Sequence, residues 1–205
     1  MTKKKLTLDN NTTASNPGEI NFKLAVWLRH NLETVVPFSI ALILFLILGF
    51  LYSYYWLLVV FCILMVSVYC YIRVSEHFSA DSNLGVIVSK EPLLLAVYTD
   101  LTKGYGSYPV IKVIDYKSLK AVELGMEVGT VSTYSGSLGG EVQYWDNFYP
   151  LPVTYATDDH REIEKVLSTY PDGQKEFILS CMEQLPKPYK KGLYRVSLEN
   201  SDWSN

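Results

Sequence analysis

An uncharged and mostly apolar stretch from Thr34 to Ile72 constrains this chain more than any other feature. A helix needs roughly 20 apolar residues to cross a hydrocarbon core about 30 Å thick, so the stretch is about twice as long as one span requires. A single helix of that length would extend roughly 60 Å at about 1.5 Å per residue, which tilting could not hide in the bilayer. We therefore predict a transmembrane hairpin in residues 34–73.

The middle of this stretch has the composition expected at a membrane surface. Four aromatic residues gather there: Tyr52, Tyr54, Tyr55 and Trp56. Tyr and Trp favour the interface, where the ring is buried and the polar tip stays wet. We place the first span at about 35–52, the turn at 53–55 and the second span at about 56–72. A secretory signal is excluded, because its apolar core is shorter and lies closer to the N-terminus.

Positive charges flank the outer ends of the hairpin. Lys23 and Arg29 precede the first span, Arg73 follows the second, and the connecting turn has no Lys or Arg. Because Lys and Arg near span ends stay in the cytoplasm, both termini are predicted to be cytoplasmic. The spans contain no charged residue, which argues against a transporter or a proton path.

The segments outside the hairpin have different compositions. Residues 1–18 are polar and are predicted to be disordered. Residues 19–33 place apolar side chains on one side of a helix that could lie on the bilayer; a polar lead-in continuing into the first span is the alternative. Residues 77–195 are predicted to form the soluble domain, and 196–205 a flexible tail.

The soluble domain is predicted to be α+β, with short strands followed by helices. Strands are expected at 86–88, 93–99, 108–116, 128–134 and 148–155, the last at an edge because of Pro150 and Pro152. Helices are expected at 158–170, capped by Thr157 or Asp158, and at 172–185, capped by Asp172. This order indicates an antiparallel sheet or small barrel with helices covering one face.

Composition excludes several functional classes. Acidic residues exceed basic ones after residue 73, within a net charge of −3, so nucleic-acid binding is not expected. Two of the three cysteines lie in the second predicted span, and no disulfide framework, metal site or cofactor is predicted.

Catalytic motifs are missing from the sequence, and we assign no catalytic residue. Asp100, Lys103 and His160 are the best candidates if the domain is an enzyme. The Asp158-Asp159-His160 cluster is more typical of a helix N-terminus.

Two segments are candidate binding sites. In the first, Lys103, Gly104, Tyr105 and Gly106 form a loop whose glycines could expose backbone N–H groups to an anion; an ordinary hairpin loop is the alternative. The second is a locally basic segment that contains Lys187, Tyr189, Lys190, Lys191 and Arg195. It could contact anionic headgroups at about 1 kcal/mol per charge, or be a solvated segment packed through its tyrosines.

The segments TDLTKGYGSYPVIKV (Thr99 to Val113) and PKPYKKGLY (Pro186 to Tyr194) resemble those of an uncharacterised bacterial family known as a domain of unknown function. The resemblance covers about residues 77–194. It implies a bacterial inner-membrane protein and carries no activity, substrate or catalytic residue over to this chain.

The leading hypothesis is a membrane-anchored, non-enzymatic interaction module at the cytoplasmic face of that membrane. Its expected partners are the lipid bilayer and another protein, and assembly of several copies stays open. One alternative is an immunity-type protein that neutralises a toxin. Others are a membrane-tethered enzyme and a small-ligand sensor that uses the Gly104–Gly106 loop.

Overall fold

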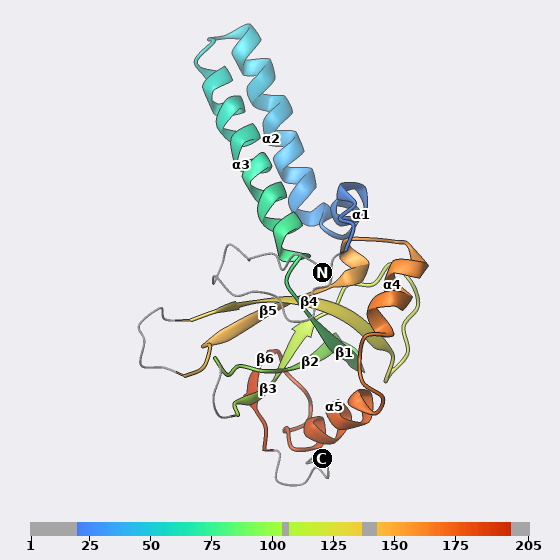
Figure 1. Cartoon of the computed structure of the whole chain (residues 1–205). Helices are drawn as coiled ribbons and strands as arrows, with labels where there is room; N and C mark the ends of the chain where they lie inside the picture. The colour runs from blue at the N-terminus through green and yellow to red at the C-terminus, as the bar shows by residue number, and fades with distance from the viewer. Residues whose placement is uncertain (1–19, 104–106, 137–142, 198–205) are drawn as a thin grey trace, which may run out of the picture.

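Two long apolar helices project together from a mixed α and β domain (Figure 1). The computed structural model describes residues 20–103, 107–136 and 143–197. The predicted disordered segment 1–18 and most of the predicted tail 196–205 lie outside these residues. The two helices are α2 (Leu32–Leu51) and α3 (Trp56–His77), and both are long and apolar enough to cross a membrane.

The helical hairpin agrees with the predicted spans, with small differences at its ends. The turn falls at 52–55, one residue longer than the predicted 53–55, while α2 begins at Leu32 and α3 continues to His77. That last turn of α3 docks on the soluble domain. The ring Nε2 of His77 donates to the carbonyl oxygen of Val131 at 2.9 Å. The helix is therefore extended by contacts that its apolar pattern does not reveal.

The segment before the first span is shorter and more bent than predicted. Helix α1 (Leu24–His30) replaces the expected helix at 19–33, and a turn at Asn31 separates it from α2. The side-chain amide of Asn31 donates to the Trp27 carbonyl at 2.8 Å, in the way that Asn competes with helical hydrogen bonds. Residues 20–23 are not helical, because Ile20 and Phe22 pack against the soluble domain.

Within the described residues, six strands form one antiparallel sheet in the order β5-β4-β1-β2-β3-β6. They are β1 (Asp81–Lys90), β2 (Leu93–Asp100), β3 (Pro109–Asp115), β4 (Glu127–Ser135), β5 (Asn147–Pro152) and β6 (Gly192–Arg195). The predicted α+β class and antiparallel sheet are confirmed, and β5 lies at an edge as its prolines indicate. The sequence missed β6, which pairs with β3 after both helices.

Strand β1 is longer than the predicted 86–88. The prediction fell short because the first residues of the strand are polar. Asn83 pairs with Thr130 across the sheet. Its carbonyl accepts hydrogen bonds from the Thr130 hydroxyl at 2.8 Å and from the Tyr170 hydroxyl at 2.9 Å. Cross-strand and helix contacts thus hold a polar segment in a strand that an apolar pattern could not indicate.

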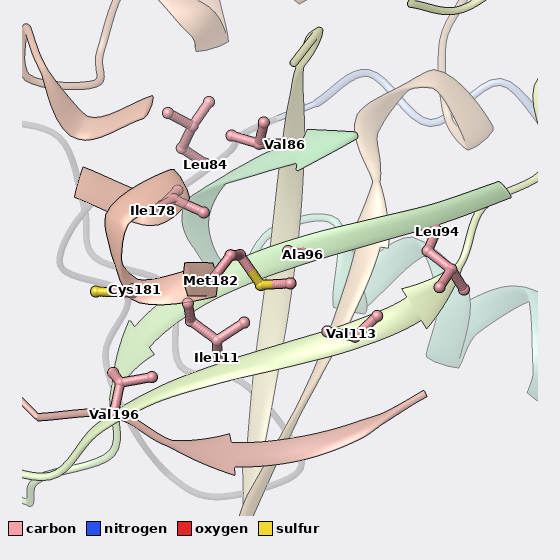
Figure 2. Close-up of a cluster of buried hydrophobic side chains, with 10 residues drawn as sticks. All are labelled: Leu84, Val86, Leu94, Ala96, Ile111, Val113, Ile178, Cys181, Met182 and Val196. Atoms are coloured by element: carbon pink, nitrogen blue, oxygen red, sulfur yellow. The ribbon is translucent and has the colours of Figure 1, made fainter. Parts of the chain in front are cut away.

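Two helices cover one face of the sheet, as predicted. Helix α5 (Gln174–Glu183) packs on the central strands, where Ile178 and Met182 contact Leu84 and Ile111 (Figure 2). Helix α4 (His160–Leu167) packs on β4, where a Cβ at Gly129 would lie 2.9 Å from Val166. Leu84 and Gly129 are register partners, so their side-chain positions share a face.

The starts of both helices differ from the predicted caps. Asp159, rather than Thr157 or Asp158, caps α4 by accepting from the Arg161 N–H at 2.9 Å. Asp158 instead accepts a hydrogen bond from Lys23. Helix α5 begins at Gln174, because Gly173 before it has a φ of 81°, a conformation that glycine adopts readily. Asp172 therefore lies outside the cap.

The other face of the sheet curls round a second core and forms a half-barrel. That core contains Ile87, Leu95, Val97, Leu101, Val110, Tyr116, Val128, Tyr134 and Phe148. Lys112 on β3 reaches β5, donating to the Asn147 side-chain oxygen at 2.9 Å and to the Phe148 carbonyl. Strands β3 and β5 are not neighbours in the sheet, so this contact requires strong curvature.

Candidate functional site

Positively charged side chains lie over aromatic rings at the open side of the half-barrel. We name this region the cation–aromatic surface; it comprises Lys103, Tyr108, Lys112, Tyr144, Trp145, Tyr149 and Arg195. Its cations lie 4.4 Å (Lys103 over Trp145), 4.5 Å (Lys112 over Tyr149) and 4.5 Å (Arg195 over Tyr108) from the ring centroids. All three distances are within the range of cation–π attraction.

Three separate segments meet in one stack on this surface. Tyr108, just before β3, stacks on Tyr144 with ring centroids 4.2 Å apart and planes 7° apart. The Arg195 guanidinium, at the end of β6, lies over the same Tyr108 ring. Because Arg195 is the register partner of Val110, the β3–β6 pairing places its side chain beside Tyr108. The pairing of the edge strand β6 with β3 thus positions the Arg195 guanidinium.

Lys112 extends from β3 on the same sheet face to contact residues of β5. Burial lowers the pKa of its half-buried ammonium group. Its contacts are the Asn147 amide oxygen, the Phe148 carbonyl and the rings of Phe148 and Tyr149. These groups are all neutral, so they orient the ammonium without neutralising its charge. An anionic group that approached this surface would meet a partly desolvated cation, where electrostatic attraction is stronger than in water.

The predicted anion-binding loop is held by a carboxylate at its base. Asp100 accepts from the N–H groups of Thr102 at 2.9 Å and Tyr108 at 3.0 Å, and from the Ser107 hydroxyl at 3.1 Å. The N–H of Lys103 donates to the Gln143 carbonyl at 2.8 Å. Asp100 therefore shapes the loop. Gly104, Tyr105 and Gly106 lie outside the described residues, so anion binding there stays a prediction.

The residues of the basic C-terminal segment make separate contacts with different parts of the domain. Lys191 pairs with Asp115 at 2.7 Å, and the Lys187 ammonium lies 5.8 Å from the Tyr189 ring. Tyr189 packs against the α5 core, and the Lys190 carbonyl accepts from the Tyr194 hydroxyl at 2.9 Å. Of the five residues proposed from this segment, Arg195 joins the cation–aromatic surface. Headgroup binding by this basic segment stays a prediction.

The three enzyme candidates do not form one group. Asp100 ends β2, and Lys103 lies in the loop between β2 and β3. His160 begins α4, where its Nε2 accepts from Lys120 at 3.3 Å, beyond the other end of β3. Seven strand residues separate these positions, which is roughly 20 Å at about 3.3 Å per residue. In the described part of the chain no three His, Cys, Asp or Glu side chains are grouped as metal ligands.

The sequence did not indicate most of this surface. Tyr108, Tyr144 and Tyr149 are unremarkable in their own segments, and curvature of the sheet brings them together. One feature of the sequence could have indicated Lys112. It lies between the apolar residues Val110 and Ile114 on one face of a predicted strand. A lysine at such a position points either to an edge or to a polar contact across the barrel.

The soluble domain is tied to the base of the hairpin by several contacts. Phe22 lies between Tyr71 of α3, at 5.7 Å, and Phe78, at 5.8 Å between ring centroids. Lys23 pairs with Asp158 at 2.9 Å; this hydrogen bond raises the pKa of Lys23 and lowers that of Asp158. The helices and the domain therefore share side-chain contacts at their junction.

Comparison with known proteins gives the family. The profile of the family described as "Protein of unknown function (DUF3239)" matches residues 75–185, which include the segment Thr99 to Val113 and end before Pro186. A crystal structure described as a candidate membrane protein from Corynebacterium diphtheriae is 17% identical, with a TM-score of 0.47 over 57% of this chain and 100% of that chain. The search of curated proteins gave no match. Since the family match covers more than half of the sequence, the chain belongs to the DUF3239 family of proteins of unknown function.

Proposed function

We propose that this protein is a membrane-anchored, non-enzymatic interaction module whose cation–aromatic surface binds an acidic segment of another protein. The α2–α3 hairpin spans a bacterial inner membrane twice, both termini are cytoplasmic, and residues 77–195 form the soluble domain. The observation that carries the proposal is the contact set of Lys112, a half-buried cation held by neutral groups.

The membrane part of the proposal is supported by the outer surface of the hairpin. Large apolar side chains there are exposed, including Ile40 at 61%, Phe50 at 80% and Phe61 at 60%. Contiguous apolar surface of this kind is costly in water and usually marks contact with lipid or protein. The positive charges of Lys23, Arg29 and Arg73 then favour the cytoplasmic side for both ends.

The recognition part is supported by the chemistry of the surface. Tyr, Trp and Arg dominate the energetics of protein interfaces, because they combine large contact area with hydrogen bonding. Tyr149 is 48% exposed and Tyr144 is 38% exposed, so the rings are accessible from outside. The surface offers Lys112 and Arg195 to carboxylates although the domain as a whole is acidic, which favours a local acidic segment over a broadly acidic partner.

Site-specific photo-crosslinking in native membranes tests this proposal. We expect a photoreactive residue at Tyr149 in the full-length chain to capture one discrete protein partner. Arg195→Glu should abolish that product by charge repulsion. A photoreactive residue at Leu124, which is 61% exposed and outside the surface, is the matched control and should not capture the partner. Identical products from both positions, or a product insensitive to Arg195→Glu, would contradict the proposal.

A further inference from the structure

A pocket of about 540 Å³ lies at the base of the hairpin, on the side of the soluble domain. Its walls come from α1, from the first half of α2 and from the second half of α3, which meet where the hairpin joins the domain (Figure 1). Trp27, Phe38, Ser39, Ser67 and Tyr71 are among the lining residues. The volume falls within the roughly 300–1,000 Å³ that is common for small-molecule sites.

Small side chains keep α2 and α3 from filling this space. Ser39 and Ser67 line it from opposite helices. Their hydroxyls donate to carbonyls of their own helices, Ser39 to Val35 at 2.9 Å and Ser67 to Ile63 at 2.8 Å. Because both hydroxyls are satisfied, the pocket offers an apolar surface. A cavity of this chemistry holds water poorly.

The pocket is closed toward the soluble domain and open at its side. Phe22, which lines it, is packed between Tyr71 and Phe78, so aromatic rings form its inner end. Phe38 and Leu64, which also line it, are 50% and 48% exposed. In a membrane these side chains face hydrocarbon, so an occupant reaches the pocket laterally from the bilayer.

We propose that this pocket binds an acyl chain of an anionic phospholipid from the surrounding membrane; this inference rests on the membrane anchoring proposed above. The chain occupies the apolar space between α1, α2 and α3. The headgroup lies at the level of α1, where exposed Arg29 directly follows Leu28, a lining residue. A basic side chain at that depth favours an anionic headgroup over a zwitterionic one.

Fluorescence quenching of Trp27 by brominated lipids tests the proposal. The probe is the full-length chain with Phe in place of the three other tryptophans, reconstituted in phosphatidylcholine nanodiscs at one chain per disc. Phosphatidylglycerol brominated on its acyl chains is added in increasing fraction. In the comparison series the bromine label is on the other lipid: phosphatidylcholine is brominated and phosphatidylglycerol is unlabelled. Half-maximal quenching is expected at an about fivefold lower fraction of the brominated anionic lipid, the size of effect that one basic residue near a membrane surface gives.

Matched variants separate the pocket from ordinary lipid contact. Ser39→Phe fills the pocket and should remove the preference for the anionic lipid. Ile40→Phe adds the same ring at the adjacent position, which is 61% exposed and outside the lining, and should retain the preference.

Four results would overturn the proposal. Equal quenching by both lipids in the inserted chain, or a preference that survives Ser39→Phe, would reject the lipid site and leave membrane anchoring intact. Loss of quenching when two chains share a disc would assign the pocket to a second copy of this chain. Failure of the folded chain to insert into the bilayer would reject the anchoring and the site together.

Discussion

The ammonium group of Lys112 on β3 donates to the backbone carbonyl of Phe148 on β5, although other strands lie between β3 and β5 in the sheet. The contact joins the two sides of the half-barrel across its open side. It also supplies a donor to a carbonyl on an edge strand, and unpaired edge groups invite pairing with other chains. One residue thus stabilises the curvature and contributes the central charge of the cation–aromatic surface.

Replacing this lysine should weaken the soluble domain. Lys112→Met keeps the aliphatic bulk but removes the donor to Asn147 and Phe148, so we expect a loss of about 1 kcal/mol in the free energy of unfolding, the usual net worth of such hydrogen bonds. Urea denaturation of the full-length protein measures the change. Lys90→Met, at the exposed end of β1, is the control and should be nearly neutral. A Lys112→Met variant as stable as the control would argue against a role in closing the half-barrel.

The hydroxyl of Tyr170 should contribute more to the free energy of unfolding than that of an exposed tyrosine. It lies 2.7 Å from the Ser82 hydroxyl and donates to the Asn83 carbonyl at 2.9 Å, connecting the segment after α4 to β1. We expect Tyr170→Phe to cost about 1–2 kcal/mol, because the partly buried Asn83 carbonyl loses one of its two donors and the Ser82 hydroxyl loses its partner. Tyr144→Phe, whose ring is 38% exposed, should change the free energy of unfolding much less. Equal effects of the two substitutions would show that the Tyr170 hydroxyl is dispensable.

Alkaline pH should destabilise the fold through buried tyrosines. Burial raises the pKa of Tyr134 to about 12, with its hydroxyl 3.0 Å from that of Thr99. Because the folded pKa is raised above the ordinary value near 10, the folded chain holds a proton that the unfolded chain has lost. Stability is therefore constant below about pH 10 and falls as the pH rises toward 12, by about 1 kcal/mol for this residue at pH 11.

Tyr134→Phe provides the test of that pH dependence. The variant should be less stable than the parent at pH 8, because it loses the contact with Thr99, but should lose less stability between pH 8 and pH 11. Denaturation at the two pH values gives the difference. A slope unchanged by the substitution would mean that Tyr134 does not titrate differently in the folded and unfolded chains.

The junction between hairpin and domain should depend on packing more than on charge. Phe22 contacts two aromatic rings, and removing a partly buried Phe costs about 2 kcal/mol, somewhat less than in a full core. The Lys23–Asp158 pair is exposed, and such pairs contribute little. Hydrogen exchange of the α1 amides, measured in detergent micelles, should therefore accelerate strongly in Phe22→Ala and little in Lys23→Ala. The reverse order would assign the docking to the ion pair.

The sequence predicted the elements whose pattern is local. The hairpin follows from an uncharged stretch, and the edge position of β5 follows from Pro150 and Pro152. Strand β6 escaped prediction because Gly192–Arg195 is short, lies in a basic segment and becomes a strand through pairing with β3. The polar start of β1 was missed for the same reason.

The candidate site was harder to predict, because it depends on contacts between distant segments. Lys103 and Arg195 were named from local composition. Tyr108, Lys112 and Tyr149 join them through curvature of the sheet and the β3–β6 pairing, which no single segment encodes. The non-helical start of the segment before α1 similarly depends on how Ile20 and Phe22 pack on the domain.

Membrane topology tests whether the α2–α3 hairpin spans the membrane twice and keeps the soluble domain in the cytoplasm. Single cysteines placed in the full-length chain at Tyr54, in the turn between α2 and α3, and at Leu124, on the soluble domain, can be labelled in intact cells with a reagent that does not cross the membrane; Cys62, Cys70 and Cys181 are first replaced. We expect labelling at position 54 from outside, and labelling at 124 only after the cells are opened. Labelling at 124 in intact cells would place the domain outside the cytoplasm and contradict the two-span, cytoplasmic module.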